Sequence, residues 1–172
     1  MPALTELPPA ASHAPPRPWE RWQPWVSTAV RLGLAAVALA AGLGKIGDLP
    51  ASVRAVRAYE LLPETLAVLL GNGLPMVEII LGVLLLTGLF TRASSALFAL
   101  LMVAFTVGIV SAWARGLAID CGCFGGGGPV EPDQTAYLVD IVRDLLFLAG
   151  AVFLVRWPRT RLSLDRALSL TD

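Results

Sequence analysis

The chain has 172 residues, of which 56% are apolar and only 15% are charged. Roughly a quarter of the residues of a soluble domain are charged, so this composition predicts an integral membrane protein. The 13 basic and 13 acidic residues cancel, which leaves no global field to attract nucleic acid. With two cysteines and a single histidine, His13, one chain cannot build a four-ligand zinc site or a thiolate-bound iron–sulfur cluster, so no metal is expected.

The N-terminal segment, residues 1–24, is rich in proline and lacks the long apolar run of a secretory signal. It therefore predicts a disordered tail. Its end, residues 19–25, spaces three tryptophans three residues apart beside arginines, which is typical of the interface between membrane and water. We expect the membrane domain over residues 25–157 and a second tail over residues 158–172.

Four stretches of the membrane domain predict helices that cross a bilayer, at about 26–46, 66–91, 93–114 and 136–155. The third contains 22 uncharged residues, which is enough for a span without assistance. Between the first two, residues 48–64 repeat apolar side chains at three-residue steps. This spacing predicts a short amphipathic helix lying on the membrane. The predicted fold is an all-α integral membrane bundle of four transmembrane helices.

Several charged residues fall within these predicted spans. Arg31 is expected to anchor the first span in the headgroup layer, whereas Lys45 lies among glycines, which allow close approach of another helix. Glu78 follows Pro75 in an apolar stretch, where a carboxylate is costly unless it faces the bundle or is paired.

The last predicted span carries Asp140, Arg143 and Asp144 in its first half. Helical spacing places both aspartates on one face, and Arg143 can reach Asp140 from the adjacent position. The expected arrangement is a polar stripe that faces inward. Glu78 and Arg143 are also predicted to form an intramembrane ion pair, as a structural pair rather than a proton relay, because either charge alone is costly to bury.

Both cysteines lie in the loop predicted over residues 115–135, within Arg115-Gly-Leu-Ala-Ile-Asp-Cys-Gly-Cys-Phe-Gly125. One intervening glycine places the Cα atoms of Cys121 and Cys123 roughly 5.5–7 Å apart, which overlaps the range of a disulfide. A disulfide that closes so short a ring constrains little of the unfolded chain and therefore stabilises the fold little. Strain in the ring favours a disulfide that exchanges with other thiols over a permanent one. We interpret Cys121 and Cys123 as a thiol pair for exchange chemistry, with a fixed disulfide as the alternative.

The surroundings of the cysteines affect this interpretation in two ways. The four glycines at 125–128 are expected to be flexible and to leave the backbone open to a partner. Asp120 would raise the pKa of a neighbouring thiol, whereas Arg115 or Lys45 nearby would lower it.

Basic residues concentrate in the N-terminal tail, at the second connection between spans and at the C-terminus. By the positive-inside rule, both termini are cytoplasmic. The Cys-Gly-Cys loop then faces outward, into a compartment where disulfides form and persist.

The motifs of this chain resemble those of the MauE family (methylamine utilisation membrane proteins), within the DoxX-like group of four-helix membrane proteins. The resemblance covers about residues 31–155, and its most specific motif is the Cys-Gly-Cys segment. The other motifs are Ala-Gly-Leu-Gly-Lys45, Arg57-Ala-Tyr-Glu-Leu-Leu-Pro63 and Leu74-Pro-Met-Val-Glu78.

The resemblance implies a multi-pass protein of the bacterial inner membrane that is needed to make a disulfide-rich exported enzyme subunit, of the methylamine dehydrogenase type. A thioredoxin-like partner commonly accompanies such a protein. In the family, an arginine of the last span is usually followed by asparagine, whereas here Arg143 precedes Asp144.

The sequence thus predicts a membrane protein that exchanges disulfides with an exported client or a thioredoxin-like protein, as a thiol–disulfide oxidoreductase in which either cysteine can attack first. The chain has no second cysteine pair, so electrons must leave to another protein or, by analogy, to a membrane quinone. The alternative is a non-catalytic scaffold for a thioredoxin-like partner, and a transporter is a distant third. The candidate supporting polar residues are Lys45, Glu78, Arg115, Asp140 and Arg143.

Overall fold

A computed structural model describes residues 18–168 of the chain, and residues 1–17 and 169–172 lie outside the described part. The predicted disordered tail therefore falls mostly outside it. The elements in chain order are α1 (Pro18–Ile46), α2 (Leu49–Ala58), α3 (Glu64–Thr87), α4 (Thr91–Ala114), β1 (Ile119–Asp120), β2 (Gly128–Pro129), the 3₁₀ helix η1 (Pro132–Gln134), α5 (Tyr137–Arg156) and α6 (Leu164–Ala167).

Three of these helices are long and apolar enough to cross a membrane: Arg21–Ile46 within α1, then α3 and α4. They overlap the first three predicted spans, although α3 ends four residues before the predicted end at 91, and the all-α fold is confirmed. The fourth predicted span corresponds to α5, which has 20 residues and carries four charges, at Asp140, Arg143, Asp144 and Arg156. Because α5 is shorter than the other three helices and has a higher proportion of charged residues, a fourth membrane crossing stays a prediction.

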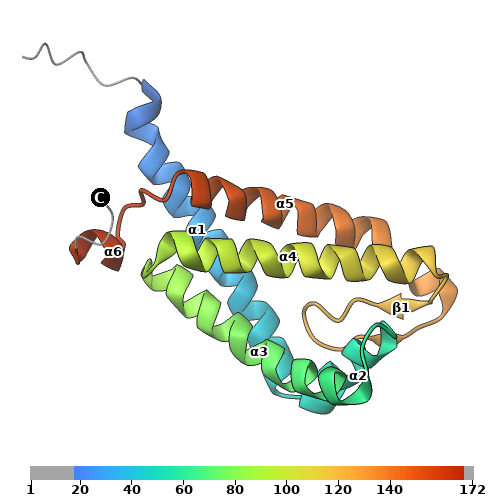
Figure 1. Cartoon of the computed structure of the whole chain (residues 1–172). Coiled ribbons are helices and arrows are strands. Elements are labelled where there is room, and N and C mark those ends of the chain that lie inside the picture. The colour runs from blue at the N-terminus through green and yellow to red at the C-terminus, as the bar shows by residue number, and fades with distance from the viewer. Residues whose placement is uncertain (1–17, 169–172) are drawn as a thin grey trace, which may run out of the picture.

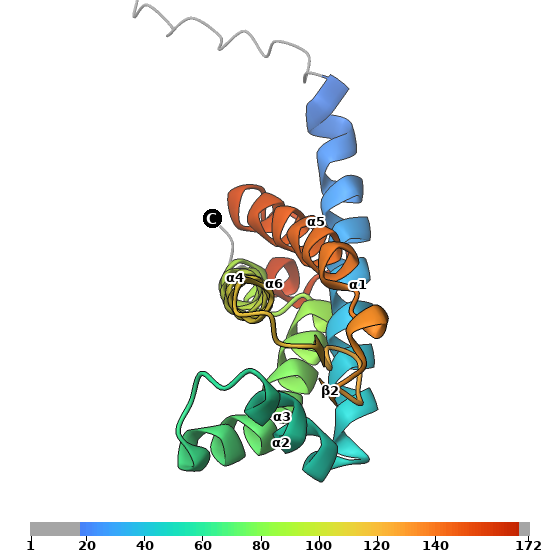
Figure 2. The ribbon, with the colours of Figure 1, turned by 90° about the vertical axis from the view of Figure 1, so that its right-hand side faces the viewer.

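The four long helices form two pairs: α1 packs mainly against α3, and α4 against α5. The pairs cross each other, as Figures 1 and 2 show. Glycines bring α1 and α3 close together. A Cβ atom on Gly42 would lie 2.8 Å from the carbonyl oxygen of Pro75, and one on Gly82 would lie 2.7 Å from Cγ of Leu39. The main apolar core joins both pairs and contains Leu34, Ala35, Ala38, Leu85, Phe98, Met102, Ala151 and Leu154.

The start of α1 packs against the segment after α5. α1 begins at Pro18, within the segment predicted as a tail. Gln23 lies on this helix, and its amide donates to the carbonyls of Trp157 and Arg159 at 3.3 Å each. Residues 157–161, most of which were predicted as part of a C-terminal tail, thus lie against the N-terminal part of α1.

Arg31 is buried at the same end of the molecule, with 1% of its surface exposed. Its Nη1 donates to the carbonyl oxygens of Leu85 at 2.6 Å and Leu86 at 3.0 Å, and its Nη2 donates to that of Leu162 at 3.0 Å. The bonds to Leu85 and Leu86 reach carbonyls in the last turn of α3, which lack the partners that carbonyls have in the middle of a helix. The prediction that Arg31 anchors the first span in the headgroups is wrong, since its side chain ends inside the protein.

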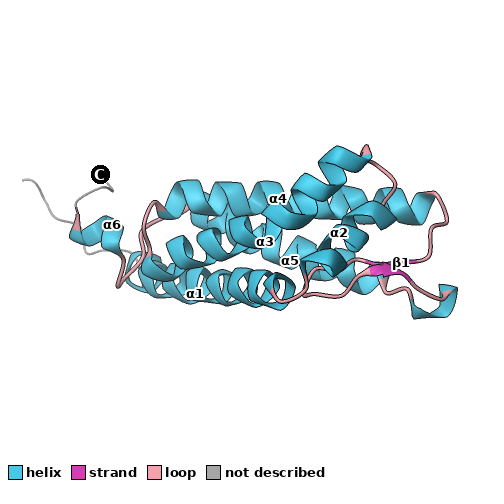
Figure 3. Cartoon of the chain, turned by 90° about the horizontal axis from the view of Figure 1, so that it is seen from below, coloured by secondary structure: helices cyan, strands magenta, loops and turns pink. Residues whose placement is uncertain are grey.

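At the opposite end lie α2 and a β-hairpin, away from α6 (Figures 1 and 3). α2 begins at the predicted place, where the Asp48 side chain accepts a hydrogen bond from the Ala51 N–H at 2.9 Å. A Cβ atom on Gly71 of α3 would lie only 2.5 Å from Cα of Val53. The predicted amphipathic helix therefore exists, but it ends at Ala58 rather than near residue 64, and its buried face packs on α3 rather than on lipid.

The hairpin pairs β1 with β2 in antiparallel register, with Ile119 opposite Pro129 and Asp120 opposite Gly128. The sequence predicts only a loop over these residues. The Cys-Gly-Cys segment follows β1 directly, so the hairpin carries the cysteine pair in its connecting turn.

Candidate functional site

Two tyrosines hold the cysteine hairpin in place. The hydroxyl of Tyr137, at the start of α5, donates to the carbonyl of Leu117 and accepts the Ile119 N–H at 3.0 Å. The hydroxyl of Tyr59, just after α2, donates to the carbonyl of Cys121 at 3.2 Å. Neither tyrosine was a predicted site residue, because a hydroxyl that binds backbone far along the chain leaves no local pattern.

The glycines around the cysteines allow close packing. A Cβ atom on Gly122 would lie 2.9 Å from Cβ of Ala55, and one on Gly125 would lie 2.9 Å from the carbonyl oxygen of Gly44. A Cβ atom on Gly127 would lie 2.6 Å from Cα of Gly122, whereas one on Gly126 would meet open space. Gly125 and Gly127 thus seat the hairpin against α1 and α2, whereas the flexibility expected of residues 125–128 stays a prediction.

Cys121 and Cys123 are free thiols, and both are partly buried. The Cys123 N–H donates to Cys121 Sγ at 3.4 Å, and Nη2 of Arg143 lies 3.6 Å from the same sulfur. A hydrogen bond from the Cys123 thiol is the main cause that lowers the pKa of Cys121, and Arg143 lowers it further against the opposing effect of burial. The hydrogen bond with Cys121, burial and the nearby Cys121 charge raise the pKa of Cys123. The environment thus divides the pair into a more acidic thiol, Cys121, and a less acidic one, Cys123.

Arg143 connects the cysteines to the acidic residues of α5. Its Nη1 lies 2.9 Å from Asp140 Oδ1 and its Nη2 lies 3.1 Å from Asp144 Oδ1. Its guanidinium also stacks over the ring of Phe124, 5.2 Å from the ring centre. The predicted polar stripe on α5 does face inward, with both Asp140 and Asp144 buried.

Glu78 pairs with Lys45 rather than with Arg143. Lys45 Nζ lies 2.5 Å from Glu78 Oε1, and both side chains are almost fully buried. The predicted pairing of Glu78 with Arg143 is replaced because Lys45 on α1 faces α3 directly, whereas Arg143 is held by its own helix.

Two other predicted neighbours make no contact with a sulfur among the hydrogen bonds and ion pairs of residues 18–168. Arg115 is exposed and donates to the carbonyl of Tyr59 and, at 3.2 Å, to that of Ser111. Asp120 is exposed on β1. The cation that contacts a thiol is thus Arg143, which is 22 residues from Cys121 in sequence.

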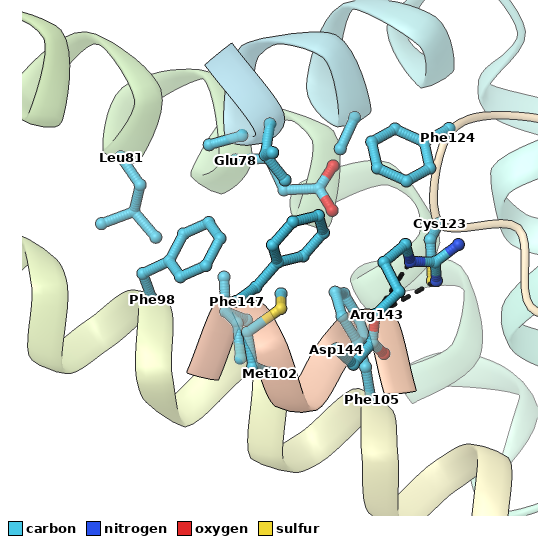
Figure 4. A pocket seen from close by; sticks show the side chains of 14 residues that line it. Glu78, Leu81, Phe98, Met102, Phe105, Cys123, Phe124, Arg143, Asp144 and Phe147 are labelled. Carbon is cyan, nitrogen blue, oxygen red and sulfur yellow. Dashed lines mark hydrogen bonds and ion pairs between the residues drawn. The ribbon is translucent and has the colours of Figure 1, made fainter. Parts of the chain in front are cut away.

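A small cavity lies beside the cysteine pair, inside the bundle (Figure 4). Its polar lining consists of Glu78, Cys123, Arg143 and Asp144, and its remaining walls come from apolar side chains such as Phe105. A water-sized sphere can occupy about 20 Å³ of it, which is room for about one water molecule. The cavity is therefore too small for the ring of the quinone considered from the sequence. Within residues 18–168, no cluster of three His, Cys, Asp or Glu side chains is placed to hold a metal ion.

The three apolar spanning helices, with charged side chains buried between the helices, define a helical membrane protein that carries a cysteine pair at one end of its bundle. Comparison with known proteins specifies the family. The model of the family described as methylamine utilisation protein MauE matches residues 23–156. The methylamine utilization protein MauE of Paracoccus denitrificans is 34% identical over 131 residues, which cover 75% of this chain and 70% of that protein. The chain belongs to the MauE family, as its motifs predicted, and no solved structure matches it.

Proposed function

We propose that this protein carries out thiol–disulfide exchange in the membrane and thereby supports the maturation of an exported protein used in methylamine utilisation. The observation that carries the proposal is the contact at 3.6 Å between Arg143 and the sulfur of Cys121. A cation beside a thiol favours the thiolate, and the thiolate is the form that attacks a disulfide. A cysteine that serves only to close a staple has no use for such a contact.

Cys121 is the attacking residue in this mechanism. Its sulfur receives hydrogen bonds from the Cys123 N–H and from Arg143, and its pKa is lowered, first by the Cys123 thiol and then by Arg143. The Cys121 thiolate attacks a disulfide of a partner protein, forms a mixed disulfide and releases one partner thiolate.

Cys123 completes the exchange. After losing its proton, it attacks Cys121 Sγ, closes the Cys121–Cys123 disulfide and releases the second partner thiolate. Two electrons thereby pass from the cysteine pair to the partner, and the reverse sequence oxidises the dithiol of a client. In the forward direction the partner is an oxidised thioredoxin-like protein, which accepts the two electrons, and in the reverse direction the client donates two electrons to the Cys121–Cys123 disulfide.

The proposal includes a membrane topology with α5 as a fourth span, both termini in the cytoplasm of a bacterial cell and the hairpin outside. The inward-facing charges of α5 support it, because a membrane-spanning helix can carry charged side chains when they face the bundle interior and pair with one another. The positions of the elements also support it. The N-terminal part of α1 and the segment 157–168 lie at one end, with the hairpin at the other (Figure 1).

Trapping of mixed disulfides in intact cells tests the exchange function. Cys123→Ser removes the resolving thiol, so it should accumulate a mixed disulfide through Cys121, and Cys121→Ser should trap much less. Acid quenching followed by thiol alkylation of the wild-type protein should show both oxidised and reduced forms. A pair that stays wholly oxidised, with both variants still supporting maturation of the client, would instead establish the non-catalytic scaffold.

An impermeant maleimide tests the topology separately. It should label the reduced cysteines of intact spheroplasts, with Cys121→Ser/Cys123→Ser as the unlabelled control. Labelling that requires lysis of the cells would place the hairpin on the cytoplasmic side and contradict the proposal.

A further inference from the structure

Two buried carboxylate oxygens beside the cysteine pair have no hydrogen-bond partner. They are Glu78 Oε2 and Asp144 Oδ2. Glu78 is 4% exposed and Asp144 is 2% exposed. Each residue uses its other oxygen in an ion pair, Glu78 with Lys45 and Asp144 with Arg143. A buried polar atom without a partner is costly, so a second group is expected to satisfy these oxygens.

Both residues line the cavity that has room for about one water molecule, and they reach it from different helices, Glu78 from α3 and Asp144 from α5 (Figure 4). A buried water forms two to four hydrogen bonds, and the unpaired oxygens offer two acceptors. Cys123 lines the same cavity from the hairpin. The lining from α4 is apolar and consists of Phe98, Leu101, Met102 and Phe105.

The charges around the cavity do not cancel. Lys45 and Arg143 are the cations of this cluster, and Glu78, Asp140 and Asp144 are its carboxyl groups. With every group ionised, three negative charges face two positive ones, and a Cys121 thiolate adds one more. An uncompensated charge inside a membrane bundle is costly, and one proton on a carboxyl group restores neutrality when both thiols are protonated.

We propose that the cavity binds a water molecule that bridges Glu78 Oε2 and Asp144 Oδ2, and that this pair of carboxyl groups accepts the proton that Cys123 loses during exchange. The second part rests on the proposed function. In the mixed disulfide, Cys121 carries no charge, and Cys123 must lose its proton before it can attack. The proton passes through the bridging water to a carboxylate, and the Cys123 thiolate then attacks Cys121 Sγ and releases the partner thiolate. The reverse reaction returns the proton to Cys123.

Before the reaction with a partner, the Cys121 thiolate adds a negative charge to the cluster. When the mixed disulfide forms, the first partner thiolate leaves and Cys121 becomes uncharged. The exchange thus changes the charge beside the carboxyl pair, which couples the protonation of that pair to the redox state of the cysteines. Burial is suited to this role, because a proton acceptor shielded from bulk water exchanges protons mainly with the group beside it.

Infrared spectroscopy of the full-length protein in lipid vesicles tests the proposal. A protonated carboxylic acid has a carbonyl stretch separate from the amide bands, and this stretch shifts in D₂O when the acid proton exchanges. At a pH where the reduced protein carries the Cys121 thiolate, the difference spectrum between the reduced and disulfide states should contain such a band, because only the reduced state then has the extra negative charge beside the carboxyl pair. Asp144→Asn and Glu78→Gln should each remove or shift the band, while Asp133→Asn, at an exposed carboxylate of η1, should leave it unchanged.

The outcomes separate the two proposals. Should the cysteine pair fail to cycle with any disulfide partner, the exchange function is overturned, and a pH titration of the reduced protein still decides whether the buried proton exists. Should the pair cycle while no carboxylic acid band changes, the acceptor role is overturned and the exchange function stands. A band that survives in both Asp144→Asn and Glu78→Gln would assign the proton elsewhere and contradict the proposed site.

Discussion

Nη2 of Arg143 lies 3.6 Å from Sγ of Cys121, which places a guanidinium from α5 against a thiol of the hairpin turn. The same guanidinium binds Asp140 and Asp144, so its position is set by its own helix before the hairpin adds a contact. The cation is thus preorganised beside the sulfur. Preorganised charge stabilises a thiolate without the cost of reorienting the donor during the reaction.

Arg143→Lys should raise the pKa of Cys121, because a lysine lacks the planar fork that reaches both aspartates and the sulfur. In a Cys123→Ser background, where Cys121 is the remaining thiol, the alkylation rate near neutral pH should fall by up to about tenfold, which corresponds to one pKa unit. The midpoint of the rate against pH should move upward. Arg115→Lys is the matched control, since Arg115 contacts backbone carbonyls and no sulfur. If the alkylation rates of the two variants depend on pH in the same way, Arg143 does not stabilise the Cys121 thiolate.

Lys45→Met should destabilise the bundle strongly, because it leaves Glu78 buried without its cation. Breaking one side of a buried pair costs about 3–5 kcal/mol, and thermal unfolding in detergent measures the loss. Arg54→Met is the control, because Arg54 pairs with Asp48 at 3.9 Å with both side chains exposed. Lys45→Met/Glu78→Met should recover much of the stability, and a double variant as unstable as the single one would show that the pair itself is not responsible.

Gly127→Ala should disturb the hairpin more than Gly126→Ala. Both glycines have positive φ angles, +85° and +71°, so both substitutions carry the left-handed strain of about 1–2 kcal/mol. They differ in packing, because a Cβ atom at Gly127 would lie 2.6 Å from Cα of Gly122, whereas Gly126 has open space. Maleimide labelling of the cysteines should therefore become faster in Gly127→Ala than in Gly126→Ala, and similar labelling would show that the close packing is dispensable.

Tyr137→Phe should loosen the strand that leads to Cys121. The hydroxyl satisfies both the Leu117 carbonyl and the Ile119 N–H, and leaving buried groups unpaired costs about 1–3 kcal/mol. Hydrogen exchange at Ile119 should become faster. Tyr59→Phe, which removes a single bond to the Cys121 carbonyl, should have less effect at Ile119. Unchanged exchange in Tyr137→Phe would mean that the β1–β2 pairing alone holds the strand.

Asp165→Ala should destabilise the turn between α3 and α4. Asp165 Oδ1 accepts the Phe90 N–H at 2.6 Å and Oδ2 accepts the Thr91 N–H at 2.7 Å, which caps the start of α4. Loss of such a cap costs about 0.5–2 kcal/mol, and thermal unfolding measures it. Asp133→Ala, at an exposed carboxylate, should have little effect. If the two variants unfold alike, the Asp165 cap contributes nothing measurable to the stability of the bundle.

The sequence predicted the helices well, because the length of an apolar stretch depends only on neighbouring residues. The predicted spans 93–114 and 136–155 differ from α4 and α5 by two residues or fewer at each end. It also identified the Cys-Gly-Cys segment, the inward polar stripe of α5 and the MauE family. It missed Tyr137 and Tyr59 as site residues, because the backbone groups that they bind are brought near by the fold rather than by spacing.

The sequence by itself determined which residues are apolar enough for a membrane and which carry thiols and charges, since these are properties of single residues and short windows. Only the tertiary structure decided the partners. The rotation of α1 against α3 brings Lys45 into an ion pair with Glu78, and the packing of the hairpin against α5 brings Arg143 into contact with Cys121. Helix rotation and packing depend on many side chains at once, so no local pattern specifies them.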